Sequence, residues 1–224
     1  MHQEDTANPL KTLQDIHSIM ERSARFLSLS GWSGVWAGCT ALAGAAIARQ
    51  WLHQAPEGYF HEYSKSIPID ETNGDYRAYL LRFAMLAIVV LVVALAGGYF
   101  FTMRKARKEG ATLWSPASRR MVFELAVPLA IGGIFAFVFL YRGLEAYIPA
   151  ICLVFYGLAL INGSKHTLSD IRYLGFFEIA LGIICLFLQG YGLLLWTVGF
   201  GVLHILYGII MWSKYDRQAI KDKA

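Results

Sequence analysis

Six long apolar runs constrain the fold of this chain more than any other feature. A helix of about 20 apolar residues, rising ~1.5 Å per residue, crosses the ~30 Å hydrocarbon core of a bilayer. Runs of roughly that length occupy residues 27–48, 79–102, 121–141, 147–163, 173–189 and 191–212. They use most of the 224 residues and leave no room for a second folded domain. The sequence therefore predicts one all-α, polytopic membrane domain of six transmembrane helices over residues 27–212.

The segments on either side of this domain differ from it in composition. Residues 1–26 predict a cytoplasmic amphipathic helix, because apolar residues recur every three or four positions after the helix-start pair Asn8 and Pro9. Two placements remain open for this helix: on the inner leaflet of the membrane, or packed against the inner face of the bundle. Residues 213–224 predict a short, basic cytoplasmic tail.

The distribution of basic residues predicts the orientation of the chain. With the N-terminus inside, 15 of the 20 lysines and arginines fall on the inner side of the predicted helices. Basic residues gather in this way on the cytoplasmic side of membrane proteins, so we expect a multi-pass protein of the inner (plasma) membrane with both termini in the cytoplasm. Topology accounts for the net charge of +4, so nucleic acid is not an expected partner. Membrane lipid is one, and a protein partner would bind at the cytoplasmic face.

Glu178 and His204 are the ionisable residues least expected inside a membrane. A charge facing lipid at the bilayer centre costs at least ~2.5–3.5 kcal/mol, so both side chains should face protein or water. If the last helical hairpin turns near Tyr191, the two residues lie at the same depth, 13 positions on either side of the turn. Two interpretations remain open: a polar clasp between two helices, or a proton-binding site used in transport.

Four other polar residues are candidates for the surroundings of this pair. They are Glu124, Tyr156, His166 and Tyr207. We expect Glu124 to form an ion pair with Lys165 or His166 at the inner rim of the bundle. Neither a metal site nor a cofactor is predicted, since the pair has no suitable third ligand and the chain carries no nucleotide-binding or zinc-binding string.

Small residues are spaced for close contact between helices. Ser30, Gly34 and Gly38 share one helical face of the first run. Small residues at every fourth position let helix backbones approach closely in lipid, and six helices offer many partners within the chain. The glycines predicted to pack helices together are Gly34, Gly38, Gly182, Gly201 and Gly208.

The third to sixth runs predict a repeated helical hairpin. Phe123-Glu124-Leu125-Ala126 opens the third run as Phe177-Glu178-Ile179-Ala180 opens the fifth. Late in the fourth and sixth runs, Tyr156-Gly157-Leu158 corresponds to Tyr207-Gly208-Ile209. The two hairpins would be parallel repeats, an arrangement found in transporters and in other membrane proteins.

The string Gly31-Trp32-Ser33-Gly34 resembles the nucleophile motif of rhomboid intramembrane proteases. The resemblance implies a serine nucleophile, Ser33, with a histidine of the sixth span, here His204, as its base. The family carries its serine on the fourth span, whereas Ser33 lies on the first. The chain also lacks the family's tryptophan-arginine first loop and its oxyanion histidine and asparagine pair.

Met20-Glu21-Arg22-Ser23, running into Phe26-Leu27-Ser28-Leu29-Ser30-Gly31, resembles functionally unassigned six-span inner-membrane proteins of bacteria. This likeness implies the six-span fold and no particular activity. The first function hypothesis is therefore a non-enzymatic membrane module that binds a lipid or protein partner. The alternatives are a small proton-coupled transporter or carrier that uses Glu178 and His204, and an intramembrane hydrolase. The absence of other catalytic motifs makes an enzyme the less favoured class.

Overall fold

The structure is a computed structural model that describes residues 30–54, 74–110 and 114–216. All regular secondary structure in these ranges is helical. The amphipathic helix predicted at 1–26 lies outside the described residues, as does most of the basic tail predicted at 213–224.

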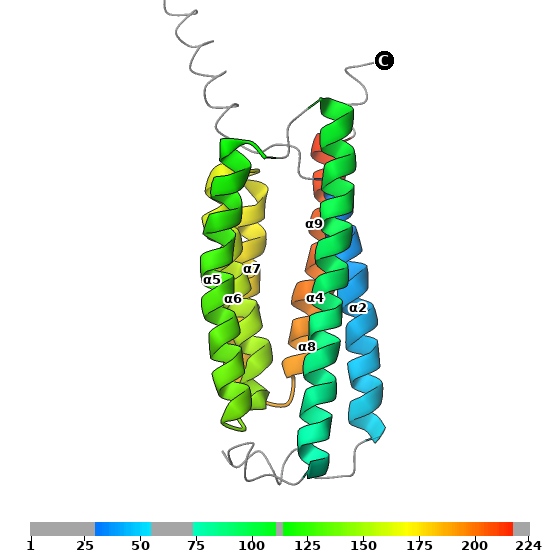
Figure 1. Ribbon diagram of the computed structural model, residues 1–224, viewed down its shortest axis with the longest axis vertical. Coiled ribbons are helices and arrows are strands. Elements are labelled where there is room, and N and C mark those ends of the chain that lie inside the picture. The colour runs from blue at the N-terminus through cyan, green and yellow to red at the C-terminus, as the bar shows by residue number, and fades with distance from the viewer. Residues whose placement is uncertain (1–29, 55–73, 111–113, 217–224) are drawn as a thin grey trace, which may run out of the picture.

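The described chain folds into long helices that alternate in direction (Figure 1). They are α2 (Gly31–Gln54), α4 (Gly74–Glu109), α5 (Pro116–Tyr141), α6 (Ile148–Gly163), α7 (Asp170–Phe187) and a continuous C-terminal helix. The C-terminal helix consists of α8 (Gly192–Trp196), the π-helical η4 (Thr197–Leu203), α9 (His204–Met211) and the π-helical η5 (Trp212–Asp216). Short 3-10 turns flank α6: η2 (Glu145–Tyr147) and η3 (Ser164–His166).

Each predicted apolar run overlaps one of these helices, and four described helices are long and apolar enough to cross a membrane. These four span Tyr76–Glu109, Pro116–Tyr141, Glu145–His166 and Gly192–Asp216. The other two differ in composition: α2 is rich in glycine and alanine, and the 18 residues of α7 include the charged Asp170, Arg172 and Glu178.

The outer surface of these helices is apolar. Side chains that are more than half exposed include Leu81, Met85, Ile88, Val89, Leu91, Val92 and Leu95 on α4, Phe123 and Phe137 on α5, and Phe187 on α7. Water would disfavour an apolar surface this large, whereas the hydrocarbon of a bilayer solvates it. The architecture is that of a membrane-embedded protein.

The helices pack in two groups of three (Figure 1). In the first group α6 lies between α5 and α7, and in the second α2 lies between α4 and the C-terminal helix. We call these the α6 group and the α2 group. The C-terminal helix also touches α6 and α7 through fewer contacts, and we call this boundary between the groups the seam.

Most of the described lysines and arginines lie at one end of the bundle, where α4 ends, α5 begins and the C-terminal helix ends. We call this the basic end; it is the upper end in Figure 1. Its basic residues are Arg104, Lys105, Arg107, Lys108, Arg119, Arg120, Lys165, Arg172 and Lys214. The opposite end holds Arg49, Arg77, Arg82 and Arg142.

Glycines bring α2 into backbone contact with the C-terminal helix. A Cβ atom added to Gly34 would lie 3.1 Å from the Cα of Gly208, and one added to Gly38 would lie 2.6 Å from the carbonyl oxygen of Gly201. Glycine costs ~1 kcal/mol in a helix relative to alanine. Here its lack of a side chain is what lets the two helices approach.

The same device joins α6 to α7 within the other group. Cβ atoms added to Gly157 and Gly175 would each meet the other glycine's carbonyl oxygen, at 2.6 and 2.7 Å. A Cβ atom on Gly182 would lie 3.0 Å from the backbone nitrogen of Val154. All five glycines predicted to pack helices together therefore lie at close helix contacts.

Two features of the fold differ from the prediction. The helix predicted at 79–102 runs from Gly74 to Glu109, and its last turns carry the pair Lys105 and Glu109, whose charged atoms are 3.8 Å apart. The two predicted hairpins also pack differently, since α5 and α6 lie in close contact whereas α7 packs on α6 more than on the C-terminal helix. The reason is that Gly201 and Gly208 face α2.

The substitution Gly38→Ala tests the glycine contact. Its methyl group would collide with the Gly201 carbonyl and Ile205, so we expect a loss of about 1–3 kcal/mol of stability and a lower Tm in detergent. Gly133→Ala is the matched control, because a Cβ atom there meets open space. Equal unfolding temperatures for the two variants would contradict the contact.

Candidate functional site

The buried polar site lies in the middle of the seam and joins three helices. Glu178 on α7 has an exposed fraction of 0%, and His204, the first residue of α9, has one of 6%. The Nδ1 atom of His204 is 3.4 Å from Oε1 of Glu178. On the other side of the ring, Nε2 is 2.7 Å from the hydroxyl oxygen of Tyr156, on α6. The structure thus brings together Glu178, His204 and one of the four neighbours considered from sequence.

The contacts of His204 define the roles of its two nitrogens. Nδ1 lies 3.0 Å from the carbonyl oxygen of Gly199 as well as near the Glu178 carboxyl group. Both neighbours are acceptors, so we assign the proton to Nδ1, which donates to Gly199. In the neutral imidazole, Nε2 then accepts a hydrogen bond from the Tyr156 hydroxyl. If Nε2 gained a proton, it would donate to the same oxygen.

The carboxyl group of Glu178 is buried without a hydrogen-bond partner among the described residues. One of its oxygens fits against Gly199, where an added Cβ atom would lie 2.5 Å from Oε2. A methyl group of Leu153 lies at the same distance from that added atom. An isolated carboxylate in such surroundings is unfavourable, and buried polar groups are usually hydrogen-bonded. The group therefore requires a proton of its own or a positive charge beside it.

A π-helical stretch shapes this part of the site. η4 ends at Leu203, immediately before His204, and contains Gly199 and Phe200. The ring of Phe200 stacks on that of His204, with centroids 5.8 Å apart and an angle of 11° between the planes, and it also lies 4.9 Å from the Tyr156 ring. π-Helical turns are rare and are often found at functional sites.

Apolar clusters close the site from both ends of the seam. Toward the basic end, Leu160, Leu168, Ile171, Leu174 and Met211 pack together, with Leu203 and Tyr207 against them. Toward the opposite end lie Ala150, Leu153 and Cys185, with Leu181, Leu195 and Phe200 against them. Tyr207, which the sequence suggested as a contact of the pair, packs against the first apolar cluster, as Tyr156 also does.

The ion pair predicted for Glu124 is wrong for the described residues. Glu124 is partly exposed and makes no ion pair with either Lys165 or His166. Lys165 is exposed and reaches Asn162 at 3.5 Å, while His166 lies in the η3 turn. The chain leaves α6 after Gly163, so the helical register used for the prediction does not extend to these two residues.

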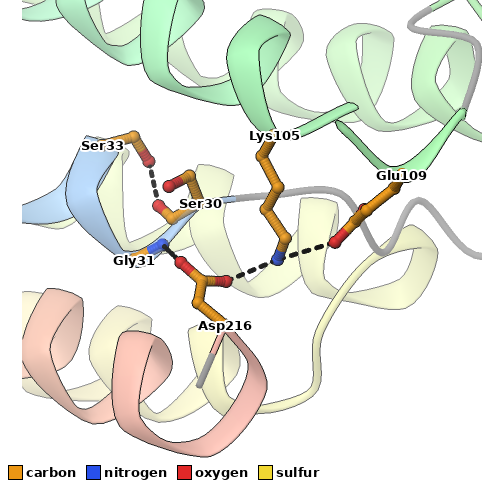
Figure 2. A network of polar contacts seen from close by, with 6 residues as sticks. All are labelled: Ser30, Gly31, Ser33, Lys105, Glu109 and Asp216. Carbon is orange, nitrogen blue, oxygen red and sulfur yellow. Dashed lines mark hydrogen bonds and ion pairs between the residues drawn. The ribbon is translucent and has the colours of Figure 1, made fainter. Parts of the chain in front are cut away.

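Ser33 is not positioned as a nucleophile activated by His204. Its hydroxyl donates to the carbonyl oxygen of Ser30 at 2.5 Å, in the first turn of α2 (Figure 2). The ring nitrogens of His204 face Gly199 and Tyr156, and no described hydrogen bond joins Ser33 to this ring. The geometry lacks the contact that a serine hydrolase needs.

Asp216 forms a polar junction that the sequence analysis missed (Figure 2). Its carboxylate accepts a hydrogen bond from the backbone N–H of Gly31 at 3.1 Å and lies 2.6 Å from the Lys105 ammonium group. An acidic group at a helix N-terminus is stabilised by the helix dipole, here that of α2. This junction ties α2, α4 and the C-terminal helix together at the basic end.

No family model, curated protein or solved structure matches this chain. Among the described residues, no group of three or more histidine, cysteine, aspartate or glutamate side chains is placed to hold a metal ion. The geometry of the Glu178 site is therefore the main indication of function.

Tyr156→Phe tests the contact between Tyr156 and His204. Loss of the hydroxyl leaves Nε2 of a buried imidazole unpaired, which we expect to cost about 1–3 kcal/mol in thermal unfolding. Tyr191→Phe removes a hydroxyl from an exposed ring in the turn before α8 and should leave the Tm unchanged. The assignment fails if both variants unfold at the parent's temperature.

Proposed function

We propose that this protein is a small proton-coupled carrier whose proton-binding site is Glu178, with His204 and Tyr156 beside it. The observation that supports it best is the Glu178 carboxyl group, which is fully buried and whose two oxygens have no hydrogen bond to any described residue. A clasp that only joins helices gains its stability from satisfied hydrogen bonds, and this carboxyl group has none among the described residues. Ionisable groups inside membrane bundles commonly mark proton or ion pathways.

The net charge of the pair explains why it can couple a proton to a second ion. The reference state is ionised Glu178 beside neutral His204, which has a net charge of −1. One additional proton, on either residue, makes the pair neutral. Loss of that proton leaves a buried negative charge, which a second cation can neutralise at the same carboxylate. A proton and a small cation would therefore compete for Glu178.

The proposal includes six membrane-spanning helices in the bacterial inner membrane, with the basic end in the cytoplasm. At ~1.5 Å per residue, the 24 residues of α2 extend about 36 Å and the 18 of α7 about 27 Å. Glu178 is covered by protein, and Asp170 and Arg172 lie at the basic end of α7. The concentration of lysine and arginine at that end supports its cytoplasmic placement.

Glu178→Gln tests the carrier. In proteoliposomes containing a pH-sensitive dye, we expect an imposed Na⁺ or K⁺ gradient to drive proton movement through the parent protein. The amide keeps the shape of the side chain but cannot release a proton, so the flux should fall at least about tenfold. Glu109→Gln, at the surface of α4, is the control and should keep the parent's flux. Parental flux in Glu178→Gln, or no flux in the folded parent, would overturn the proposal.

A second candidate function is recognition of anionic lipid at the basic end of α4. Arg104, Arg107 and Lys108 have exposed side chains and share a shallow hollow with Phe100 and Met103. In a membrane, the apolar pair would lie against acyl chains and the three cations against headgroup phosphates. Each basic residue near an anionic leaflet contributes ~1 kcal/mol.

Replacing Arg104, Arg107 and Lys108 by glutamine tests this second function. We expect at least about tenfold less phosphatidylglycerol or cardiolipin to remain bound in native mass spectrometry, since about three favourable charges are lost. Glutamine at Arg77 and Arg82, at the opposite end of the same helix, provides the control. Equal lipid retention in both variants would show that the basic end has no specific role.

A further inference from the structure

Two polar clusters cross the seam, one at each end of the bundle. At the basic end, the Asp170 carboxylate at the start of α7 accepts hydrogen bonds from Lys214, at 2.8 and 3.1 Å, and from the Tyr215 hydroxyl, at 2.7 Å. Burial opposes ionisation of Asp170, but the hydrogen bonds from Lys214 and Tyr215 outweigh it and hold the pKa of Asp170 below its usual value. The carboxylate is therefore ionised at neutral pH.

At the opposite end, the cluster joins α4 to the start of α6. The Tyr76 hydroxyl donates to Oε1 of Glu145, in the η2 turn, at 2.5 Å. Tyr76 is fully buried, and nearby Gly192 of α8 packs against Pro149 of α6. The hydrogen bond between Tyr76 and Glu145 also links the α2 group to the α6 group. The boundary between the groups therefore has a polar cluster at each end and the Glu178 site between them.

The contacts across the seam differ in kind from those within the two groups. Inside the groups, glycines such as Gly157, Gly175, Gly38 and Gly201 bring backbones together. At the centre of the seam, Gly199 faces side-chain atoms of the other group. Side-chain contacts can exchange for water or rotate away, whereas backbone contacts require whole helices to separate. Movement of the two groups along the seam would therefore break side-chain contacts and leave the backbone contacts within each group intact.

We propose that the two clusters are the gates of the carrier. The contact of Asp170 with Lys214 and Tyr215 closes the path from Glu178 to the basic end, and the contact of Tyr76 with Glu145 closes the path to the opposite end. Opening one gate while the other stays closed exposes Glu178 to one side at a time. This inference rests on the proposed carrier function and adds the residues that regulate access to its site.

The positions of the clusters fit this role. Along α7, Asp170 lies eight residues from Glu178, about 12 Å by helical rise, and the apolar cluster of Leu174 and Met211 fills the interval. The Lys214 side chain is 53% exposed, so water competes for its contact with Asp170. Opening this gate then requires separation of the contact between Asp170 and Lys214 and of the apolar cluster below it. The glycine contacts within each helix group stay intact.

Thiol labelling with a membrane-impermeant methanethiosulfonate reagent in detergent tests the gates. Two single-cysteine proteins report on the two halves of the seam. One keeps native Cys185, which is 3% exposed and lies toward the opposite end. The other carries Leu174→Cys, toward the basic end. The background carries Cys39→Ser and Cys152→Ser, with Cys185→Ser added for the second probe.

We expect Tyr76→Phe to raise the labelling rate at position 185 at least about fivefold without raising that at position 174. Asp170→Asn should do the reverse. Glu145→Gln and Lys214→Gln remove the other partner of each gate and should repeat the two patterns. Tyr147→Phe and Glu109→Gln are the matched controls, because they alter polar contacts that stay within one group.

Each outcome separates the gates from the carrier. If the gate variants remain folded by thermal unfolding and label at the parent's rate, or label faster at both positions alike, the gate proposal is overturned. That result leaves the flux measurement on Glu178→Gln unaffected. If labelling follows the expected pattern but Glu178→Gln keeps full flux, the seam opens as proposed while Glu178 is not the proton site.

Discussion

Glu178 has to be kept away from lipid, and the packing of the bundle follows from how this is done. A carboxyl group facing hydrocarbon costs at least ~2.5–3.5 kcal/mol if charged. The structure covers it with α6 on one side and the C-terminal helix on the other, so that its exposed fraction is 0%. Because α7 carries the acid, the face that bears Glu178 has to lie against other helices, while Phe176 and Phe187 of the same helix remain exposed like the apolar side chains of α4 and α5.

The glycines separate the bundle into its two groups, because a glycine face can pack closely against only one neighbouring helix. Gly201 and Gly208 are used against α2, and Gly157 and Gly175 are used between α6 and α7. The contact between α7 and the C-terminal helix is therefore made by side chains and by the π-helical turn η4. The polar site thus lies where the backbone packing is less close than within either group, and a seam between two better-packed groups follows without any special hinge sequence.

The order of the helices and the depth of the polar pair could be predicted from the sequence, since both depend on local pattern. Apolar runs locate helices, and equal spacing from the turn near Tyr191 places Glu178 opposite His204. The ion pair expected for Glu124 failed because its register was carried past the end of α6. Asp216 and Gly199 were missed because their roles depend on which helices become neighbours, and a π-helical turn has no sequence signature comparable to a proline or a cap.

In the proposed carrier, the charge of the central pair connects the site to the two proposed gates. When one additional proton is bound to either ionised Glu178 or neutral His204, the pair has no net charge. The apolar clusters on both sides can then remain closed around it. Removal of that proton inside a closed seam would leave an unscreened charge beside Leu153 and Phe200, which is highly unfavourable. Proton release therefore requires either water from an open gate or a cation already at the carboxylate. In the proposed carrier, electrostatics alone would therefore couple the protonation of the site to the opening of the seam.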